Sequence, residues 1–174
     1  MKKLLTITVA SLVFFLATPF SGFSQVYQKG DKLLNAGIGL GTYGYGGLGF
    51  GGSLEFGVTD AISVGPLVGY SSTSEGYLGL GNYKFSTLTI GARGSYHLSD
   101  LLKINSDKID LYAGLGLGYH NFHSNYSGYS GSYGSGITFL AHLGGRYYLS
   151  DNIGIFAELG SGFSTLHAGV AFKF

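Results

Sequence analysis

Imidazole and hydroxyl groups come close together at His120, His123 and Ser124, a combination that could serve nucleophilic or metal chemistry. A histidine activates a serine hydroxyl when a carboxylate orients the imidazole ring, but the surrounding segment contains no carboxylate. Two histidines also need further ligands to hold a zinc ion, and the sequence identifies none. We therefore assign no catalytic residue, no cofactor and no metal site, and we expect a protein that is not an enzyme.

A second group of ionisable residues is spread through segments of small and apolar residues. It comprises Glu55, Arg93, Arg146, Glu158 and Lys173, with His97, His142, His167 and Asp110 nearby. Charges in such surroundings either line a water-filled pore or pair with one another, because an unpaired buried charge is very costly. Two acids against three bases can pair almost completely, so the residues are candidates for an ion-pair network.

Two overlapping glycine strings, Gly39–Gly44 and Gly44–Gly49, match the pattern G-x-G-x-x-G. In a dinucleotide site this string opens a helix whose N-terminus receives the pyrophosphate. Here a strand-like alternation follows, and glycine is abundant throughout the chain. The match is therefore interpreted as coincidence.

The composition is unusual for a soluble domain. The 174 residues include 32 glycines, 14 tyrosines and 13 phenylalanines, whereas only 11% are charged and none is cysteine. Soluble domains usually carry about a quarter charged residues. After residue 24 no apolar run is long enough for a membrane helix, and no basic excess suggests nucleic-acid binding. Low charge and many aromatics without such a helix are typical of a membrane β-barrel.

Apolar residues alternate with small or polar ones in eight segments, which is the period of a strand with one apolar face. We predict strands near 33–43, 48–58, 61–71, 83–98, 109–121, 135–149, 152–161 and 164–174. The apolar face points outward in this interpretation, and the five charged residues named above then face the lumen. Outward aromatics fall at the two ends of the predicted strands, as expected for rings at lipid headgroups.

The connections between the predicted strands are of two kinds. Related sequences at Val58–Asp60, Leu98–Asp100 and Leu149–Asp151 predict turns in which Ser, Thr and Asp bond the local backbone. These turns are short except for the connection at 99–108, which is longer and charged. Residues 72–82 and 122–134 predict longer loops at the other end. Pro66 lies within a predicted strand and cannot donate a backbone hydrogen bond, so we expect a bulge at Gly65-Pro66.

The two ends of the chain carry targeting patterns. Lys2 and Lys3 precede an apolar run, and small residues precede Gln25, which predicts a signal peptide over residues 1–24. His167, Gly169, Phe172 and Phe174 match the pattern polar-x-Gly-x-x-aromatic-x-aromatic at the C-terminus. This pattern resembles the assembly signal of bacterial outer-membrane barrels.

With the alternation and the repeated turns, residues 25–174 resemble the small outer-membrane β-barrel family of Gram-negative bacteria, which includes OmpA-type and OmpX-type barrels. The resemblance implies an all-β, eight-stranded antiparallel transmembrane barrel that is inserted by the barrel assembly machinery. It also implies contact with outer-membrane lipid and lipopolysaccharide, and periplasmic N- and C-termini. The family includes structural anchors, adhesins, narrow channels and lipid-modifying enzymes, so it leaves the activity open.

Lumen size favours one role over the others. An eight-stranded barrel has an interior that side chains just fill, so we expect the charged residues to close it. The predicted function is a structural or surface-interaction role through outer loops, in which Tyr126, Tyr129 and Tyr133 offer an aromatic contact surface. A narrow channel for small solutes is the alternative, followed by a lipid-modifying enzyme.

Overall fold

The structure is a computed structural model that describes residues 26–43, 47–77, 81–104, 106–124 and 134–174. The predicted signal peptide and the loop aromatics Tyr126, Tyr129 and Tyr133 lie outside the described residues. Within the described ranges, no helix has the length and the apolar character needed to cross a bilayer.

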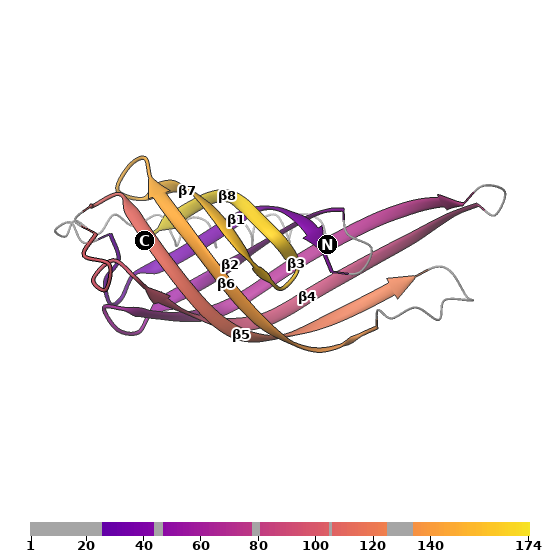
Figure 1. The fold of residues 1–174 in the computed structure, drawn as a ribbon, viewed down its shortest axis with the longest axis horizontal. Coiled ribbons are helices and arrows are strands. Elements are labelled where there is room, and N and C mark those ends of the chain that lie inside the picture. The colour runs from indigo at the N-terminus through magenta and orange to yellow at the C-terminus, as the bar shows by residue number, and fades with distance from the viewer. Residues whose placement is uncertain (1–25, 44–46, 78–80, 105, 125–133) are drawn as a thin grey trace, which may run out of the picture.

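Eight antiparallel strands form a closed barrel, as Figure 1 shows. The strands are β1 (Lys32–Thr42), β2 (Leu48–Gly57), β3 (Ile62–Tyr77), β4 (Gly81–His97), β5 (Ile109–Ser124), β6 (Gly136–Tyr148), β7 (Ile153–Ser161) and β8 (Ser164–Lys173). Each strand pairs with its neighbours in the chain, and β8 pairs with β1 from Leu33↔Lys173 to Thr42↔Ser164. The predicted all-β class, the closed antiparallel barrel and the number of strands are confirmed.

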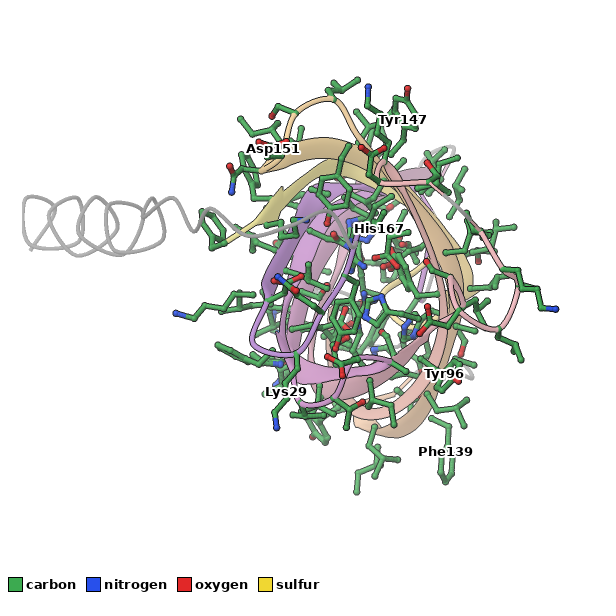
Figure 2. The ribbon with its side chains drawn as sticks, turned by 90° about the vertical axis from the view of Figure 1, so that its left-hand side faces the viewer. Lys29, Tyr96, Phe139, Tyr147, Asp151 and His167 are labelled. Carbon is green, nitrogen blue, oxygen red and sulfur yellow. The ribbon has the colours of Figure 1, made fainter. Side chains whose placement is uncertain are left out.

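Strict alternation gives the barrel wall two chemically different faces. The outward positions carry exposed large apolar side chains, such as Ile38, Phe50, Ile90, Leu115, Phe139, Leu143 and Ile155. Figure 2 shows Tyr96, Phe139 and Tyr147 on the outside of the wall, whereas His167 lies within its outline. The inward positions bury both polar and apolar side chains. The predicted faces are therefore confirmed.

The two ends of the barrel differ. We call the end that carries residues 26–31 and the connections 58–61, 98–108 and 149–152 the turn end, and the opposite end the extended end. Thr59 Oγ1 accepts hydrogen bonds from the backbone N–H groups of Ala61 and Ile62, and Ser150 Oγ accepts one from Ile153. These two contacts confirm the predicted turn chemistry. Ser99 differs, because its hydroxyl is buried and has no partner among the described residues.

Strand lengths correct the predicted loops. Residues 72–77 continue β3, residues 81 and 82 begin β4, and residues 122–124 continue β5, so much of the two predicted long loops is strand. β3, β4 and β5 have 16 or 17 residues, whereas β7 and β8 have 9 and 10. In Figure 1 the hairpin of β3 and β4 and the end of β5 project at the right, beyond the β7–β8 hairpin.

The bulge predicted at Gly65-Pro66 is wrong. The β2–β3 register is the same on both sides of Pro66, with Ser53↔Leu67 on one side and Phe56↔Val64 on the other. Only the pairings between these two positions are missing, while β3 pairs with β4 without interruption through Pro66↔Ala92. The continuous ladder to β4 holds the strand in place. The missing N–H of Pro66 therefore interrupts the ladder to β2 locally, but β3 contains no extra residue at this point.

Candidate functional site

Arg93 on β4 lies in the lumen between two carboxylates. Its Nη2 donates to Glu55 Oε1 of β2 at 2.6 Å and to Glu158 Oε1 of β7 at 2.7 Å. Its Nη1 donates to Glu158 Oε2 at 2.9 Å, and its Nε donates to Glu55 Oε1 at 3.0 Å. The planar guanidinium therefore bridges strands on opposite sides of the closed sheet, which is a geometry that arginine suits better than lysine.

Arg146 on β6 forms a second centre nearer the turn end. Its side chain is fully buried, and its Nη1 donates to Asp110 Oδ2 at 2.7 Å. Its Nε donates to Asn35 Oδ1 at 2.9 Å, and its Nη2 lies 3.5 Å from Glu55 Oε1. The guanidinium carbon also lies 4.0 Å from the centroid of the Tyr112 ring. Glu55 thus joins the two arginines into one group, and we call Glu55, Arg93, Asp110, Arg146 and Glu158 the ion cluster.

Neutral side chains complete the hydrogen bonding of the cluster. The Tyr112 hydroxyl donates to Glu158 Oε1 at 2.7 Å, and Asn35 Nδ2 donates to the same oxygen at 3.1 Å. Gly144 leaves the room that these groups need, since a Cβ there would lie 2.7 Å from Glu158 Cγ and 2.9 Å from the Tyr112 hydroxyl. Buried carboxylates are stable in this position because charged and neutral donors surround them.

The structure brings together four of the five predicted network residues but not Lys173. Its Nζ donates to the backbone oxygen of Val26 at 3.2 Å and lies 5.1 Å from the Tyr148 ring centroid. Lys173 lies at the turn end, opposite Leu33 in the β1–β8 ladder, and the N-terminal segment occupies the space beside it. Its assignment to the network is therefore wrong. Asp110 is the acid that belongs there, and it stands directly opposite Arg146 in the β5–β6 register.

Ser63, His97 and Asp110 form an arrangement that sequence reasoning missed. His97 Nε2 lies 3.0 Å from Ser63 Oγ, and His97 Nδ1 lies 2.7 Å from Asp110 Oδ1. These are the contacts of a serine–histidine–aspartate triad. However, the Ser63 hydroxyl donates to Glu55 Oε2 at 2.6 Å, so its proton points away from the histidine. Ser63 and Asp110 are also fully buried. The geometry therefore favours a structural role for these three residues.

Residues 26–31 cover the ion cluster at the turn end. The Tyr27 ring stacks on His97 with 3.4 Å between ring centroids, and its hydroxyl lies 2.6 Å from the Ile62 carbonyl oxygen. Burial raises the pKa of the Tyr27 hydroxyl, and it also raises the pKa of Asp31, which lies just before β1. This segment closes the lumen at the turn end, and no pattern in the sequence indicated it.

The residues with the most suggestive sequence chemistry are separated in the structure. His120 faces inward, where its Nδ1 lies 2.8 Å from Thr89 Oγ1 and its ring stacks on Tyr43 at 3.8 Å. His123 is exposed at an outward position, so the two histidines cannot share a metal ion. Among the described residues, no three His, Asp or Glu side chains are grouped as metal ligands. The described parts of the glycine strings lie in β1 and β2 or directly beside them, not at a helix N-terminus.

The residues of the predicted assembly signal lie on both faces of β8 and directly after its end. His167 points inward, with its Nδ1 3.7 Å from Glu158 Oε2. A Cβ at Gly169 would collide with the backbone of Ala36 on β1, so this glycine permits close contact at the seam between the first and last strands. Phe172 and Phe174 stack with 6.4 Å between ring centroids. The sorting role of these residues stays a prediction.

No protein-family model and no curated protein sequence matches the chain. Solved structures do match. The outer membrane protein OprG of Pseudomonas aeruginosa is 13% identical, with a TM-score of 0.59 over 85% of this chain and 97% of that chain. The outer membrane protein Ail of Yersinia pestis, determined in a phospholipid bilayer nanodisc, is 14% identical, with a TM-score of 0.51 over 83% and 98%. The N-terminal barrel domain of Pseudomonas aeruginosa OprF is 18% identical, with a TM-score of 0.49 over 84% and 98%. The first two comparisons show that the chain has the fold of small outer-membrane barrels, as the sequence resemblance predicted.

Proposed function

We propose that this chain is an integral outer-membrane β-barrel protein with a closed lumen, which acts as a structural or surface-interaction protein. The observation that carries the proposal is the ion cluster. Two guanidinium groups and three carboxylates join five of the eight strands across the lumen, and all five side chains are buried. A water-filled channel would leave such groups solvated instead of paired.

The outer wall supports the membrane location. Its outward positions carry large apolar side chains exposed to the surroundings, including Phe139 at 83% and Leu115 at 72%. Such a surface is expected to contact lipid acyl chains, with aromatic side chains at the membrane interfaces. In small barrels of this kind, short turns lie on the periplasmic side and longer connections outside. We therefore place the turn end in the periplasm and the extended end at the cell surface.

The uneven height of the wall supports a surface role. The strands β3, β4 and β5 continue beyond the β7–β8 hairpin, so the wall is higher on this side of the barrel (Figure 1). A rigid sheet that carries loops above the membrane presents them to other molecules at little entropic cost. The contact surface for a partner is therefore proposed on this projecting part.

Planar-bilayer recording tests the closed lumen. Protein comprising residues 25–174 would be refolded, and its folded state would be verified by heat-modifiable gel mobility. We expect no reproducible conductance steps from the wild-type protein. Discrete openings that change with Arg93→Ala would contradict the proposal and show that the charged residues line a path for small solutes.

Epitope insertion tests the orientation. A short tag between Tyr77 and Gly81 at the extended end should be detected by antibody on intact cells. The same tag at Asp60-Ala61, in a turn of the opposite end, is the matched control and should be detected only after the outer membrane is permeabilised. Detection of the control tag on intact cells would reverse the proposed orientation.

A further inference from the structure

Phe163 forms the turn between β7 and β8, and its ring is buried, although it lies at the end of a hairpin. Its backbone oxygen accepts a hydrogen bond from the Tyr43 N–H at 3.1 Å, which ties the turn to the end of β1. The Phe163 ring also meets His167 edge to face, with 4.8 Å between centroids. The Phe163 side chain therefore points into the lumen instead of away from the barrel.

Three glycines on three neighbouring strands make room for the Phe163 ring. A Cβ at Gly39 on β1 would lie 2.6 Å from the ring, and a Cβ at Gly51 on β2 would lie 3.0 Å from it. A Cβ at Gly69 on β3 would collide with the ring. The ring is thus seated in a cradle that larger side chains would fill, and it lies in the lumen on the extended side of the ion cluster.

A small cavity adjoins Phe163. Its volume is about 40 Å³, and its lining includes Arg93, His142, Glu158, Phe163, Ser164 and His167. Ser164 Oγ and His167 Nε2 are buried polar atoms with no hydrogen-bond partner among the described residues. Buried polar groups in proteins are almost always satisfied, either by protein or by ordered water. Two such atoms beside one cavity therefore indicate that the cavity holds a hydrogen-bonding guest.

We propose that this cavity is a binding site for a cluster of about three water molecules and that Phe163 is the lid that separates it from the extended end of the lumen. Water suits the site because a guanidinium and a carboxylate line it together, so both donors and acceptors are available. A guest with a net charge would be repelled by one of these two groups. The inference concerns a site that the proposed function does not use, and it stands whether or not the barrel has a surface partner.

Cysteine accessibility tests the lid, because the chain contains no cysteine and an introduced one is unique. Ser164→Cys would be made in the wild-type background and together with Phe163→Ala, and its reaction with a small charged methanethiosulfonate would be followed on the refolded protein in detergent micelles, where both ends of the barrel are accessible. Modification of a buried group follows the population of the open form, so we expect Phe163→Ala to raise the rate by on the order of tenfold or more. Equal rates in the two backgrounds would overturn the lid.

Phe156→Ala is the matched control. Phe156 meets the same His167 ring at 4.7 Å with nearly the same geometry, but it belongs to the middle of β7 and not to the turn. Its removal should leave the rate at Ser164→Cys unchanged if Phe163 is the lid. An equal acceleration by both substitutions would indicate general loosening and would overturn the assignment.

A crystal structure of the wild-type protein at a resolution that shows ordered water tests the site itself, independently of whether the variants fold. We expect density for water within hydrogen-bond distance of Ser164 Oγ and His167 Nε2. A dry cavity, or side chains that satisfy each other directly, would overturn the binding site. Neither result depends on conductance, so this inference and the closed lumen can fail separately.

Discussion

The two halves of the lumen are closed by different chemistry. Near the turn end, charged groups pair in the ion cluster, and Tyr27 covers them. Toward the extended end, the buried polar side chains of the described residues carry hydroxyl or imidazole groups: Thr42, Ser71, Thr87, Thr89 and His120. There the ring of Phe163 occupies the space that three glycines leave free. Closure by paired charges is stable, but the loss of one charged partner leaves another buried charge unpaired. Closure by packing depends instead on how well the side-chain volumes fill the lumen.

Loss of Arg146 should have the largest effect. Arg146→Ala leaves Asp110 and Glu55 buried with one cation fewer, and breaking a buried pair in this way costs about 3–5 kcal/mol of unfolding free energy. The midpoint of urea unfolding and the temperature at which the fast-migrating gel form disappears should both fall. Lys108→Ala, at an exposed position of the turn end, is the control. Unchanged heat resistance in both Arg146→Ala and Arg93→Ala would show that the ion cluster does not stabilise the half of the lumen near the turn end.

Overpacking next to Phe163 should destabilise the half of the lumen toward the extended end. Gly69→Ala places a methyl group against the Phe163 ring, and overpacking of this kind costs about 1–3 kcal/mol. Gly136→Ala is the matched control, since nothing lies within 4 Å of the position that its methyl group would occupy, and its effect should stay within about 0.5 kcal/mol. Urea unfolding measures both variants. Equal stability of the two would show that Phe163 moves away easily and that shape does not close this half.

Removal of a single neutral hydrogen bond should have a smaller effect. Thr89→Val deletes the hydroxyl that lies 2.8 Å from His120 Nδ1, and we expect a loss of about 1 kcal/mol. The same unfolding measurement applies, with His123→Asn on the exposed face as the control. A loss as large as that of Arg146→Ala would erase the distinction between the charged and the uncharged half.

The smallest effect concerns pH at the turn end. Burial raises the pKa of Asp31 above the value of 3.8 for an exposed aspartate. As the pH falls through this raised pKa, the folded protein takes up the proton before the unfolded chain does, so this group favours folding increasingly as the pH falls toward 3.8. Asp31→Asn should therefore be more stable than the wild type at pH 7, and the difference should shrink near pH 4. The same difference in stability between Asp31→Asn and the wild type at pH 7 and at pH 4 would contradict the raised pKa of Asp31.

Much of this architecture was predictable from alternation alone. The period of two assigned the lumen to Glu55, Arg93, Arg146 and Glu158, and the same rule places Asp110 opposite Arg146. The projecting part of β3 was missed because Ser72–Gly76 is polar or small at every position, so neither face of the strand is marked by apolar residues. The ladder to β4, which continues to Tyr77↔Gly81, sustains this part of the strand.

Other features depend on tertiary contacts that no local pattern contains. Lys173 alternates inward as predicted, but the position of residues 26–31 decides its partner. The stacking of Tyr27 on His97 joins residues 70 positions apart in the chain. Alternation also gives no orientation for a turn residue, so the inward position of Phe163 could not be foreseen. The sequence therefore predicted the strands and the two faces of the barrel wall well. It predicted the side chains that close the lumen only in part.

The ladder between β1 and β8 has a consequence for the order of events during biogenesis. The first and last strands lie at opposite ends of the described chain, and their pairing closes the largest loop in the molecule. Such non-local contacts form late and slowly, because the entropy of loop closure must be overcome first. Until β8 is in place, β1 and β7 each expose a row of unpaired backbone groups that can join another chain. The pairing of β8 with β1 is therefore the step that removes both exposed strand edges and with them the risk of aggregation.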